Sequence, residues 1–470
     1  MLNTLNDVLN NVDNFIWGMP LIILILFTGI LLTVRLRGLQ IRHLGKALHY
    51  VFHNEDDGEG EVTSFGALCT ALSATIGTGN IVGCATAIVA GGPGALFWMW
   101  LAAFFGMATK YAEGMLAVKY RVIAEDGHTL GGPFYYIEKG MGKNFKWLAK
   151  LFCVFGTMVG LFGIGTFTQV NGITSAVNNF FDPSNVHTIS LFGMNYSISV
   201  VVAGIIVTIC AGLVIIGGIK RISKVSEVIV PFMAVTYIGV CLIIVFTHLP
   251  QVPAAFAEIV QSAFGLKAVA GGAIGAMTVA MQKGIARGIF SNEAGLGSAP
   301  IAAAAAQTNE PVRQGLVSMT GTFIDTIVIC TMTGLSIVIA GSWLDPKLEG
   351  VAITMDAFQK GLPFPGFIAT FSLMLCLVFF AFTTILGWDY YGERCVEYLF
   401  NRNKAVVKGY RWLYILAVFI GPYMTVAAVW NIADIFNALM AFPNLIALLA
   451  LSGVVVKETK EFHAKHKGSY

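Results

Sequence analysis

The sequence predicts an all-α integral membrane protein with about eleven transmembrane helices, built as an inverted repeat of five and five helices in which two helices are discontinuous. Three observations predict this fold: an apolar composition, a series of apolar segments of spanning length, and two glycine-rich interruptions at matching places. The 470 residues are 56% hydrophobic and only 12% charged, whereas soluble domains are about 25% charged. An ordinary cytosolic enzyme is therefore excluded, because too little polar surface remains to face water.

Eleven segments are long and apolar enough to cross the roughly 30 Å hydrocarbon core of a bilayer, which takes about 20 residues. Residues 1–34 contain no lysine or arginine, so we interpret the first segment as a membrane helix and not as a secretory signal. The segments extend approximately over residues 15–34, 63–90, 94–118, 149–180, 197–217, 226–247, 265–290, 313–341, 365–392, 411–430 and 434–456.

Lysine and arginine are distributed asymmetrically among the connections. If the N-terminus lies outside, the inner connections carry 25 of the 29 basic residues, as the positive-inside rule requires. We therefore expect a cell-membrane protein with its N-terminus outside and its C-terminus in the cytoplasm. The net charge of +3 gives no indication of a nucleic-acid partner. Eight single cysteines without metal-ligand spacing indicate neither a zinc site nor a disulfide framework.

Two of the expected helices contain glycines near the middle of the membrane. The second segment reads Gly77-Thr-Gly-Asn80-Ile-Val-Gly83, and the seventh reads Gly271-Gly-Ala-Ile-Gly275-Ala-Met-Thr278. Each glycine lowers helix propensity by about 1 kcal/mol, and unwound backbone at that depth is tolerated only where it is buried in protein or lines a cavity. We expect both helices to break at these places. The alternative is close helix packing, because both segments contain GxxxG pairs.

The two interrupted segments each begin a set of five spans, and the sets cross the membrane in opposite directions. This pattern is typical of inverted-repeat transporters. A half-helix N-terminus offers N–H groups to a carboxylate, and freed carbonyls can coordinate a small cation. The geometry therefore suits a zwitterion together with a sodium ion. The expected division is an additional helix and cytoplasmic loop (1–62), the first repeat (63–247), the second repeat (248–456) and a cytoplasmic tail (457–470).

Three motifs resemble those of the alanine or glycine:cation symporter family. The first reads Gly91-Gly-Pro-Gly-Ala-Leu-Phe-Trp-Met-Trp and continues to Gly106; the others are Gly131-Gly-Pro-Phe-Tyr-Tyr-Ile-Glu138 and Gly288-Ile-Phe-Ser-Asn-Glu-Ala-Gly-Leu-Gly-Ser-Ala-Pro300. The resemblance covers residues 60–450. It implies a LeuT-like fold, sodium- or proton-coupled uptake of small neutral amino acids, and no cofactor besides the coupling ion. The first span is then an addition before ten core helices.

Residues 73–80 are also similar to the first core helix of the neurotransmitter:sodium symporters, which have Gly-Leu-Gly-Asn where this chain has Gly-Thr-Gly-Asn. Thr78 departs from that pattern, since those symporters have an apolar side chain at its position. By this resemblance, the amino acid faces Thr75 and Gly79 and has its carboxylate beside Asn80, while sodium takes carbonyls from Ser73 and Ile76.

The family resemblance also assigns residues on later spans. Thr383 and Thr384 match hydroxyl ligands of the sodium site, and hard oxygen ligands suit a small cation; alternatively, each threonine bonds its own i−4 carbonyl. Gln169 lies in an apolar span and is expected to hydrogen-bond the amino acid, with a polar contact between helices as the alternative.

The second expected break supplies the remaining substrate positions. Gly275, Ala276 and Met277 are expected to line the substrate, and Trp388 is expected to form a wall of the cavity. Together, Met277 and Trp388 would leave room for only a short side chain. The alternative for Trp388 is a place in the interfacial aromatic belt.

Several ionisable residues lie at membrane depth, where charged side chains suggest function. Lys110 and Glu113 are spaced to neutralise each other, and Asp325 has no basic residue within a helical turn, so its partner stays open. Asp389 follows Trp388 directly. The motif Ser291-Asn-Glu293 is expected at the cytoplasmic end of its span, as a gate or as a helix cap.

The function predicted from these observations is secondary active import of alanine, glycine or a similarly small amino acid with sodium, by alternating access. Proton coupling is the closest alternative. A channel is a further alternative, although no filter sequence is present. The motifs HExxH, GxSxG and GxxxxGK[ST] are absent, so neither an enzyme nor an ATP-driven pump is indicated.

Overall fold

The computed structural model is 81% helical and describes residues 8–9, 11–12, 15–53, 58–124, 127–191, 193–266, 272–424 and 426–466, the side chains of 426–430 excepted. Six of the described helical segments are long and apolar enough to cross a membrane, or seven if one bent pair counts as a span. These segments confirm a multi-pass helical membrane protein. The count of eleven spans and the five-plus-five repeat stay predictions.

The first half of the chain forms α2 (Met19–Arg35), α3 (Leu39–Arg42), α4 (Leu44–Phe52), α5 (Ser64–Thr75), η1 (Gly79–Gly83), α6 (Cys84–Gly91), α7 (Gly94–Lys119), α8 (Pro133–Tyr136), η2 (Ile137–Met141), η3 (Lys143–Phe145), α9 (Lys146–Phe162), α10 (Phe167–Phe181), α11 (Ile198–Ile215) and α12 (Gly218–Thr247). Two antiparallel hairpins lie between these helices. They pair β1 (Val122–Ile123) with β2 (Thr129–Leu130), and β3 (Thr188–Leu191) with β4 (Met194–Ser197).

The second half of the chain is helical in all its regular elements that the structure describes. It forms η4 (Leu249–Gln251), α13 (Val252–Ala263), α14 (Ala273–Asn292), α15 (Ala299–Ala303), α16 (Pro311–Thr322), η5 (Phe323–Cys330), α17 (Thr331–Ala340), η6 (Ser342–Leu344), α18 (Val351–Gly361), α19 (Gly366–Leu399), α20 (Lys404–Ile420), η7 (Gly421–Tyr423) and α21 (Val426–Lys465).

The expected break in the first glycine-rich segment is confirmed. Helix α5 begins with a Thr63 cap, whose side chain accepts a hydrogen bond from the Gly66 N–H (2.9 Å), and ends at Thr75. The backbone is extended at Ile76, and the helix resumes in the π-helical turn η1. The two helical pieces meet at an angle of 52°.

The second break lies elsewhere than the sequence suggests. The expected interruption at 271–278 is wrong for its described part, because α14 runs unbroken from Ala273 to Asn292, while Gly271 lies outside the described residues. The chain breaks instead at Glu293 (φ 58°), Gly295 (φ 91°) and Gly297 (φ 80°), before α15. A helix tolerates an isolated glycine at about 1 kcal/mol, whereas a segment in which every second residue has a positive φ cannot continue a right-handed helix.

The two breaks face each other because α6 and α14 pack together. A Cβ added at Gly83 would lie 3.9 Å from Arg287 Cδ, and one added at Gly79 would lie 3.2 Å from Ser291 Cα. The end of α14 therefore reaches the η1 turn, and the irregular segment 293–298 follows directly after this contact.

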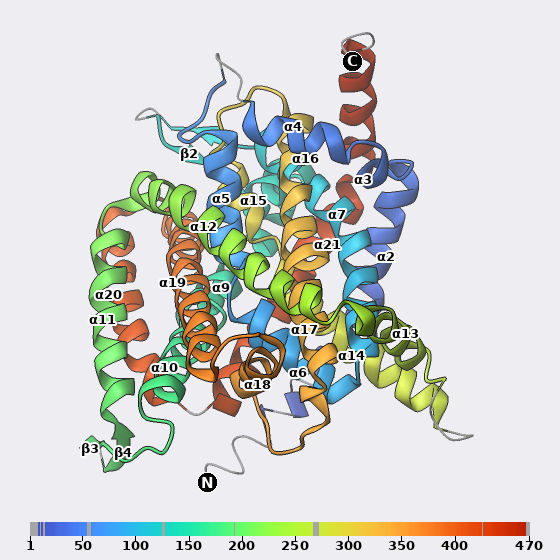
Figure 1. Ribbon diagram of the computed structural model, residues 1–470. Coiled ribbons are helices and arrows are strands. Elements are labelled where there is room, and N and C mark those ends of the chain that lie inside the picture. Colours follow the sequence, from blue (N-terminus) through green and yellow to red (C-terminus); the bar gives the residue numbers. More distant parts are fainter. Residues whose placement is uncertain are drawn as a thin grey trace.

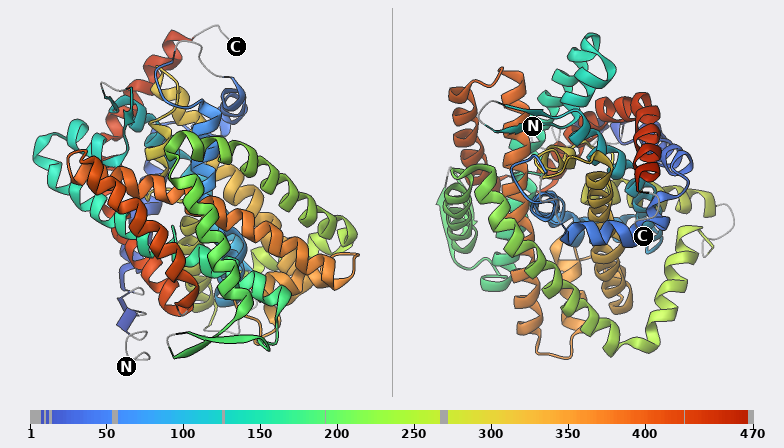
Figure 2. Two further views of the ribbon diagram at one scale, coloured as in Figure 1. Left: turned by 90° about the vertical axis from the view of Figure 1, so that its left-hand side faces the viewer. Right: turned by 90° about the horizontal axis from the view of Figure 1, so that it is seen from above.

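Several of the expected inner connections lie on one face of the molecule, whereas residues 283–292 of the expected connection 283–313 belong to α14. In Figure 1 the upper face carries α3, α4, the β1–β2 hairpin and the end of α21, whereas the β3–β4 hairpin and α18 lie at the opposite end. We call the upper one the basic face. Seen from that face in Figure 2, α11 and α20 lie next to each other at one edge of the molecule. The helices α5, α7 and α16 lie nearer its centre.

Candidate functional site

Gln169 connects the start of α10 to the first helix break. Its Oε1 accepts a hydrogen bond from the Thr78 N–H (3.1 Å), and its Nε2 donates to the Ile164 carbonyl (2.9 Å). A Cβ added at Gly77 would lie 2.9 Å from this Oε1, so only glycine lets the amide approach the backbone. Gln169 is buried and is the predicted substrate residue that contacts the break from another helix.

Thr384 meets the same break from α19. Its hydroxyl lies within hydrogen-bond distance of the Ile76 carbonyl (3.2 Å) and of the Phe380 carbonyl in its own helix (3.0 Å). A hydroxyl oxygen and a freed carbonyl oxygen, both predicted as sodium ligands, are thus direct neighbours. The Thr383 hydroxyl bonds carbonyls of its own helix, those of Phe379 and Phe380, as the alternative interpretation expected.

Asn80 links the first break to a buried carboxylate. Its Oδ1 accepts from the Gly77 N–H (2.9 Å), and its Nδ2 donates to Asp325 Oδ1 (2.7 Å). Asp325 Oδ2 accepts from the hydroxyls of Ser291 (2.9 Å) and Thr326 (2.7 Å). The sequence indicated Asp325 without a partner; the structure supplies three partners from three helical segments.

The second break is held by two glutamates. Glu293 Oε1 accepts from the Trp388 indole N–H (2.9 Å) and its Oε2 accepts from the Ser298 hydroxyl (2.5 Å). Glu113 Oε1 accepts from the Gly295 N–H (3.1 Å) and from Asn444 Nδ2 (2.7 Å). Peptide groups released by the break are therefore satisfied by buried side chains, as buried polar groups must be.

Trp388 is fully buried in the described structure, which excludes a place in a lipid-facing aromatic belt. Its ring is fixed by the bond to Glu293 and stands edge-on to Tyr391 (centroids 5.4 Å apart). Lys110 and Glu113 make no direct ion pair in the part of the chain that the structure describes, so the expected mutual neutralisation does not take that form. Lys110 instead lines a narrow cleft with Thr75, between α5, α7, α15 and α16.

Three predicted substrate residues do not reach this cluster. Gly275 and Ala276 are exposed and Met277 is partly exposed, all in the first turns of α14, and a Cβ added at Gly275 would meet no atom within 4 Å. Their assignment rested on a break that the structure places at 293–298. The side chains of the other predicted residues are buried.

A sequence model of the sodium:alanine symporter family matches residues 2–469. The chain belongs to the sodium:alanine symporter family. It is 48% identical over 468 residues to the sodium/alanine symporter AgcS of Methanococcus maripaludis, covering 98% of both chains. It is 55% identical over 465 residues to an uncharacterized transporter of Haemophilus influenzae, covering 99% of this chain and 97% of the other. The probable sodium/glutamine symporter GlnT of Bacillus subtilis is 38% identical over 469 residues, covering 99% and 92%.

The fold of this sodium:alanine symporter family member is that of a solved LeuT-like protein. The crystal structure of MhsT in complex with L-phenylalanine superposes with a TM-score of 0.54 at 13% identity, covering 85% of this chain and 99% of MhsT. Membership makes the chain a multi-pass membrane transporter that couples an amino acid to a cation, and it indicates a transporter instead of an enzyme.

On the basic face of the symporter, the start of the first broken helix is hydrogen-bonded to the end of the second. Residues 59–62, before α5, exchange backbone hydrogen bonds with 305–308, after α15. The Arg121 guanidinium donates to the carbonyls of Ala304 (3.0 Å), Ala306 (2.7 Å), Glu59 (2.6 Å) and Thr308 (2.8 Å). One arginine side chain therefore joins the segment before α5 to the segment after α15.

Sequence reasoning missed the role of Glu293 and the partners that hold the second break. The signal was present in the motif Asn292-Glu-Ala-Gly-Leu-Gly-Ser298, which has two glycines spaced by one residue after polar side chains. The first break has the same form, Gly77-Thr-Gly79 followed by Asn80. In this symporter, closely spaced glycines beside polar residues mark the breaks better than glycine content alone.

Proposed function

We propose that the protein imports small neutral amino acids, alanine and glycine, together with sodium by alternating access. The observation that carries this proposal is the contact between the Thr384 hydroxyl and the Ile76 carbonyl at the first helix break. The sodium/alanine symporter AgcS, which is similar over nearly its whole length, supports the substrate and the ion. We further propose eleven spans, two five-helix repeats (63–247 and 248–456), an outside N-terminus and a cytoplasmic C-terminus.

Sodium would bind between the broken helix and α19. The oxygens of Thr384 and Ile76 lie 3.2 Å apart, about the spacing of two adjacent ligands around a hard cation whose bonds to oxygen are, like those of calcium, about 2.3–2.6 Å long. When the ion binds, the Thr384 proton turns to the Phe380 carbonyl, 3.0 Å away, and a lone pair is left for the cation. The Ser73 carbonyl and Thr383 would complete the set.

The amino acid would lie between the two breaks, against Thr75, Gly79, Asn80, Gln169 and Trp388. Free peptide N–H groups at an interrupted helix favour a carboxylate, and Gln169 is already bonded to one such N–H. Because Glu293 fixes the Trp388 ring, the wall it forms is rigid and favours a short side chain. In this proposal the segment 293–298 lines the substrate in place of residues 275–277.

Transport requires closure on one side at a time, and the Arg121 contacts supply a closed basic face. Sodium entry would drive accumulation. One charge moving through about 100 mV contributes roughly 2.3 kcal/mol, and a tenfold sodium gradient adds about 1.4 kcal/mol. One sodium ion per substrate would therefore support at most about 500-fold accumulation.

The deciding experiment is uptake of labelled alanine into proteoliposomes. Uptake should require an inward sodium gradient and collapse with a sodium ionophore. Uptake driven by a pH gradient without sodium would favour proton coupling, for which the buried Asp325 is the candidate group. Downhill flux independent of either gradient would favour a channel, and a chemically altered substrate would favour an enzyme.

A further inference from the structure

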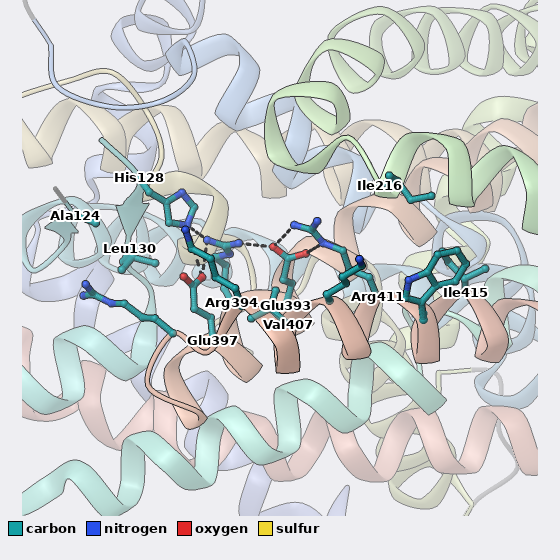
Figure 3. Close-up of a pocket in the computed structure, with 14 residues that line it drawn as sticks. Ala124, His128, Leu130, Ile216, Glu393, Arg394, Glu397, Val407, Arg411 and Ile415 are labelled. Atoms are coloured by element: carbon teal, nitrogen blue, oxygen red, sulfur yellow. Dashed lines mark hydrogen bonds and ion pairs between the residues drawn. The ribbon is translucent and has the colours of Figure 1, made fainter. Parts of the chain in front are cut away.

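A large pocket lies beside the β1–β2 hairpin of the basic face, and Figure 3 shows side chains that line it. Its volume is about 1070 Å³, enough for a molecule of the usual ligand size. It is bounded by the β1–β2 hairpin, the end of α11 at Ile216, the end of α19 and one face of α20. Neither the sodium residues nor the substrate residues line it, so the transport site does not explain it.

The charge of this pocket is strongly positive. Five basic side chains and two glutamates line it, beside His128: Arg394, Arg402, Lys404, Lys408, Arg411, Glu393 and Glu397. Both glutamates form ion pairs with arginines of the pocket. Glu393 bonds Arg394 and receives two hydrogen bonds from Arg411, one of them at 2.9 Å, and Glu397 pairs with Arg394 at 2.7 Å. Arg402, Lys404 and Lys408 make no ion pair with any acidic side chain that the structure describes.

The face of α20 that lines the pocket changes character along its length. Lys404, Lys408, Arg411 and Ile415 follow one another at helical spacing, with Trp412 beside them. Over about 16 Å of helix, the face passes from exposed cations to an apolar surface. Trp412 is 58% exposed and Ile216, across the pocket, is 56% exposed. Both α11 and α20 expose further apolar side chains, among them Leu213, Leu413 and Leu416.

The basic residues are not explained by the stability of the helix. Lys404 and Lys408 lie in the first two turns of α20, where cations oppose the helix dipole, and the first turn holds no acidic residue. The helix end itself is already capped, because the Asn403 side chain accepts from the Ala405 and Val406 N–H groups. The cations are therefore placed at a local cost to the helix and face the pocket.

We propose that this pocket binds an anionic phospholipid, with its phosphate at Arg402, Lys404 and Lys408 and its acyl chains along Trp412, Ile415 and Ile216. Basic pockets between helices at the membrane surface suit acidic headgroups, at about 1 kcal/mol for each lysine or arginine. The apolar end of the pocket, at Trp412, Ile415 and Ile216, distinguishes this site from one for a soluble anion. The lipid would bridge α11 and α20, whose Arg411 is held by α19, the helix that carries Thr384 and Trp388.

The test is native mass spectrometry of the purified protein titrated with dioleoyl phosphatidylglycerol. The double variant Lys404→Gln/Lys408→Gln should bind the lipid about thirtyfold more weakly, from the loss of two cations. The matched control is Lys139→Gln/Lys150→Gln, which removes the same charge at two exposed lysines outside the pocket. The control should retain the wild-type affinity. Equal loss in both variants would show only diffuse attraction to the basic face and would overturn the site.

Two further arms use the unaltered protein, so they do not depend on the folding of a variant. Dioleoyl phosphatidylcholine should bind at least tenfold more weakly than phosphatidylglycerol, because its headgroup has no net charge. Inorganic phosphate and the deacylated headgroup glycerophosphoglycerol should fail to displace the lipid at millimolar concentration. Displacement by either would assign the pocket to a soluble phosphate compound and refute the lipid assignment.

Discussion

Replacing Gly77 with alanine tests the geometry of the first helix break directly. Gly77 does not have a positive φ, so alanine strains no backbone angle there. The added Cβ, however, would lie 2.5 Å from Thr384 Oγ1 and 2.9 Å from Gln169 Oε1. Ordinary contacts begin at 3.4 Å, so the overlap with Thr384 is about 0.9 Å. The Thr384 side chain or the break itself must move by a comparable amount.

The expected cost follows from the overlap. An extra methyl group forced into a packed interior costs about 1–3 kcal/mol. If α19 moves away from Ile76, the cost falls on the sodium-bound state, and the sodium concentration for half-maximal alanine uptake should rise about 5- to 150-fold. Uptake into proteoliposomes over a range of external sodium concentrations measures this value.

Gly83, in the same bent helix pair, provides the matched control. A Cβ there would have its nearest neighbours at 3.9 Å and 4.0 Å, which is ordinary contact. Gly83→Ala should leave the sodium dependence unchanged and stabilise the helix by up to about 1 kcal/mol. If Gly77→Ala and Gly83→Ala gave the same sodium dependence, the close approach of Thr384 to the break would be refuted.

Four further substitutions test the first break, the Arg121 contacts and the Glu61 carboxyl. Gln169→Ala should weaken amino-acid binding at least tenfold in a scintillation proximity assay, with sodium binding largely retained. Thr384→Val should raise the half-saturating sodium concentration. Loss of sodium binding in the first variant and of amino-acid binding in the second would contradict the assignment. In Arg121→Lys the single ammonium group cannot bond four carbonyls, so amide hydrogen exchange at 59–62 should become at least tenfold faster. Unchanged exchange would show that the Arg121 hydrogen bonds do not hold this segment. Burial raises the pKa of the Glu61 carboxyl, but hydrogen bonds from His128 and the Thr129 N–H outweigh it and hold the pKa below its ordinary value. Glu61→Gln should therefore lower the melting temperature at neutral pH, and the difference should vanish as the pH falls through that lowered pKa; a difference that persists in acid would contradict this.

Much of the site was predictable because its residues are unusual where they stand. Gln169 and Asn80 are polar side chains in apolar helices, and burying an amide without a partner costs about 1–3 kcal/mol. Such residues must bond something, and the structure places both at the first break. The sequence could not show that Asn80 bonds Asp325, 245 residues away, because nothing local encodes which helices meet.

The adjacent threonines show a finer limit. Thr383 and Thr384 are identical in type, yet they bond different partners. The Thr383 hydroxyl contacts only atoms of α19 and α12, whereas the Thr384 hydroxyl reaches the Ile76 carbonyl. Successive helical residues point about 100° apart, so the rotation of α19 against α5 decides which hydroxyl meets the break. That rotation is fixed by packing, for example by Gly387, whose added Cβ would lie 2.7 Å from Ala74 Cβ.

Composition alone was enough to predict the class of the protein and the first interruption, since both depend on local properties: apolar length and helix propensity. The place of the second break depends on contacts between helices that are distant in sequence. The glycines near 275 stay helical at small cost, whereas Glu293, Gly295 and Gly297 take positive φ values because Glu113, Asn444 and Trp388 bond the segment from three other helices. Helix propensity is local, but the partners that stabilise an unwound backbone are brought together by the fold.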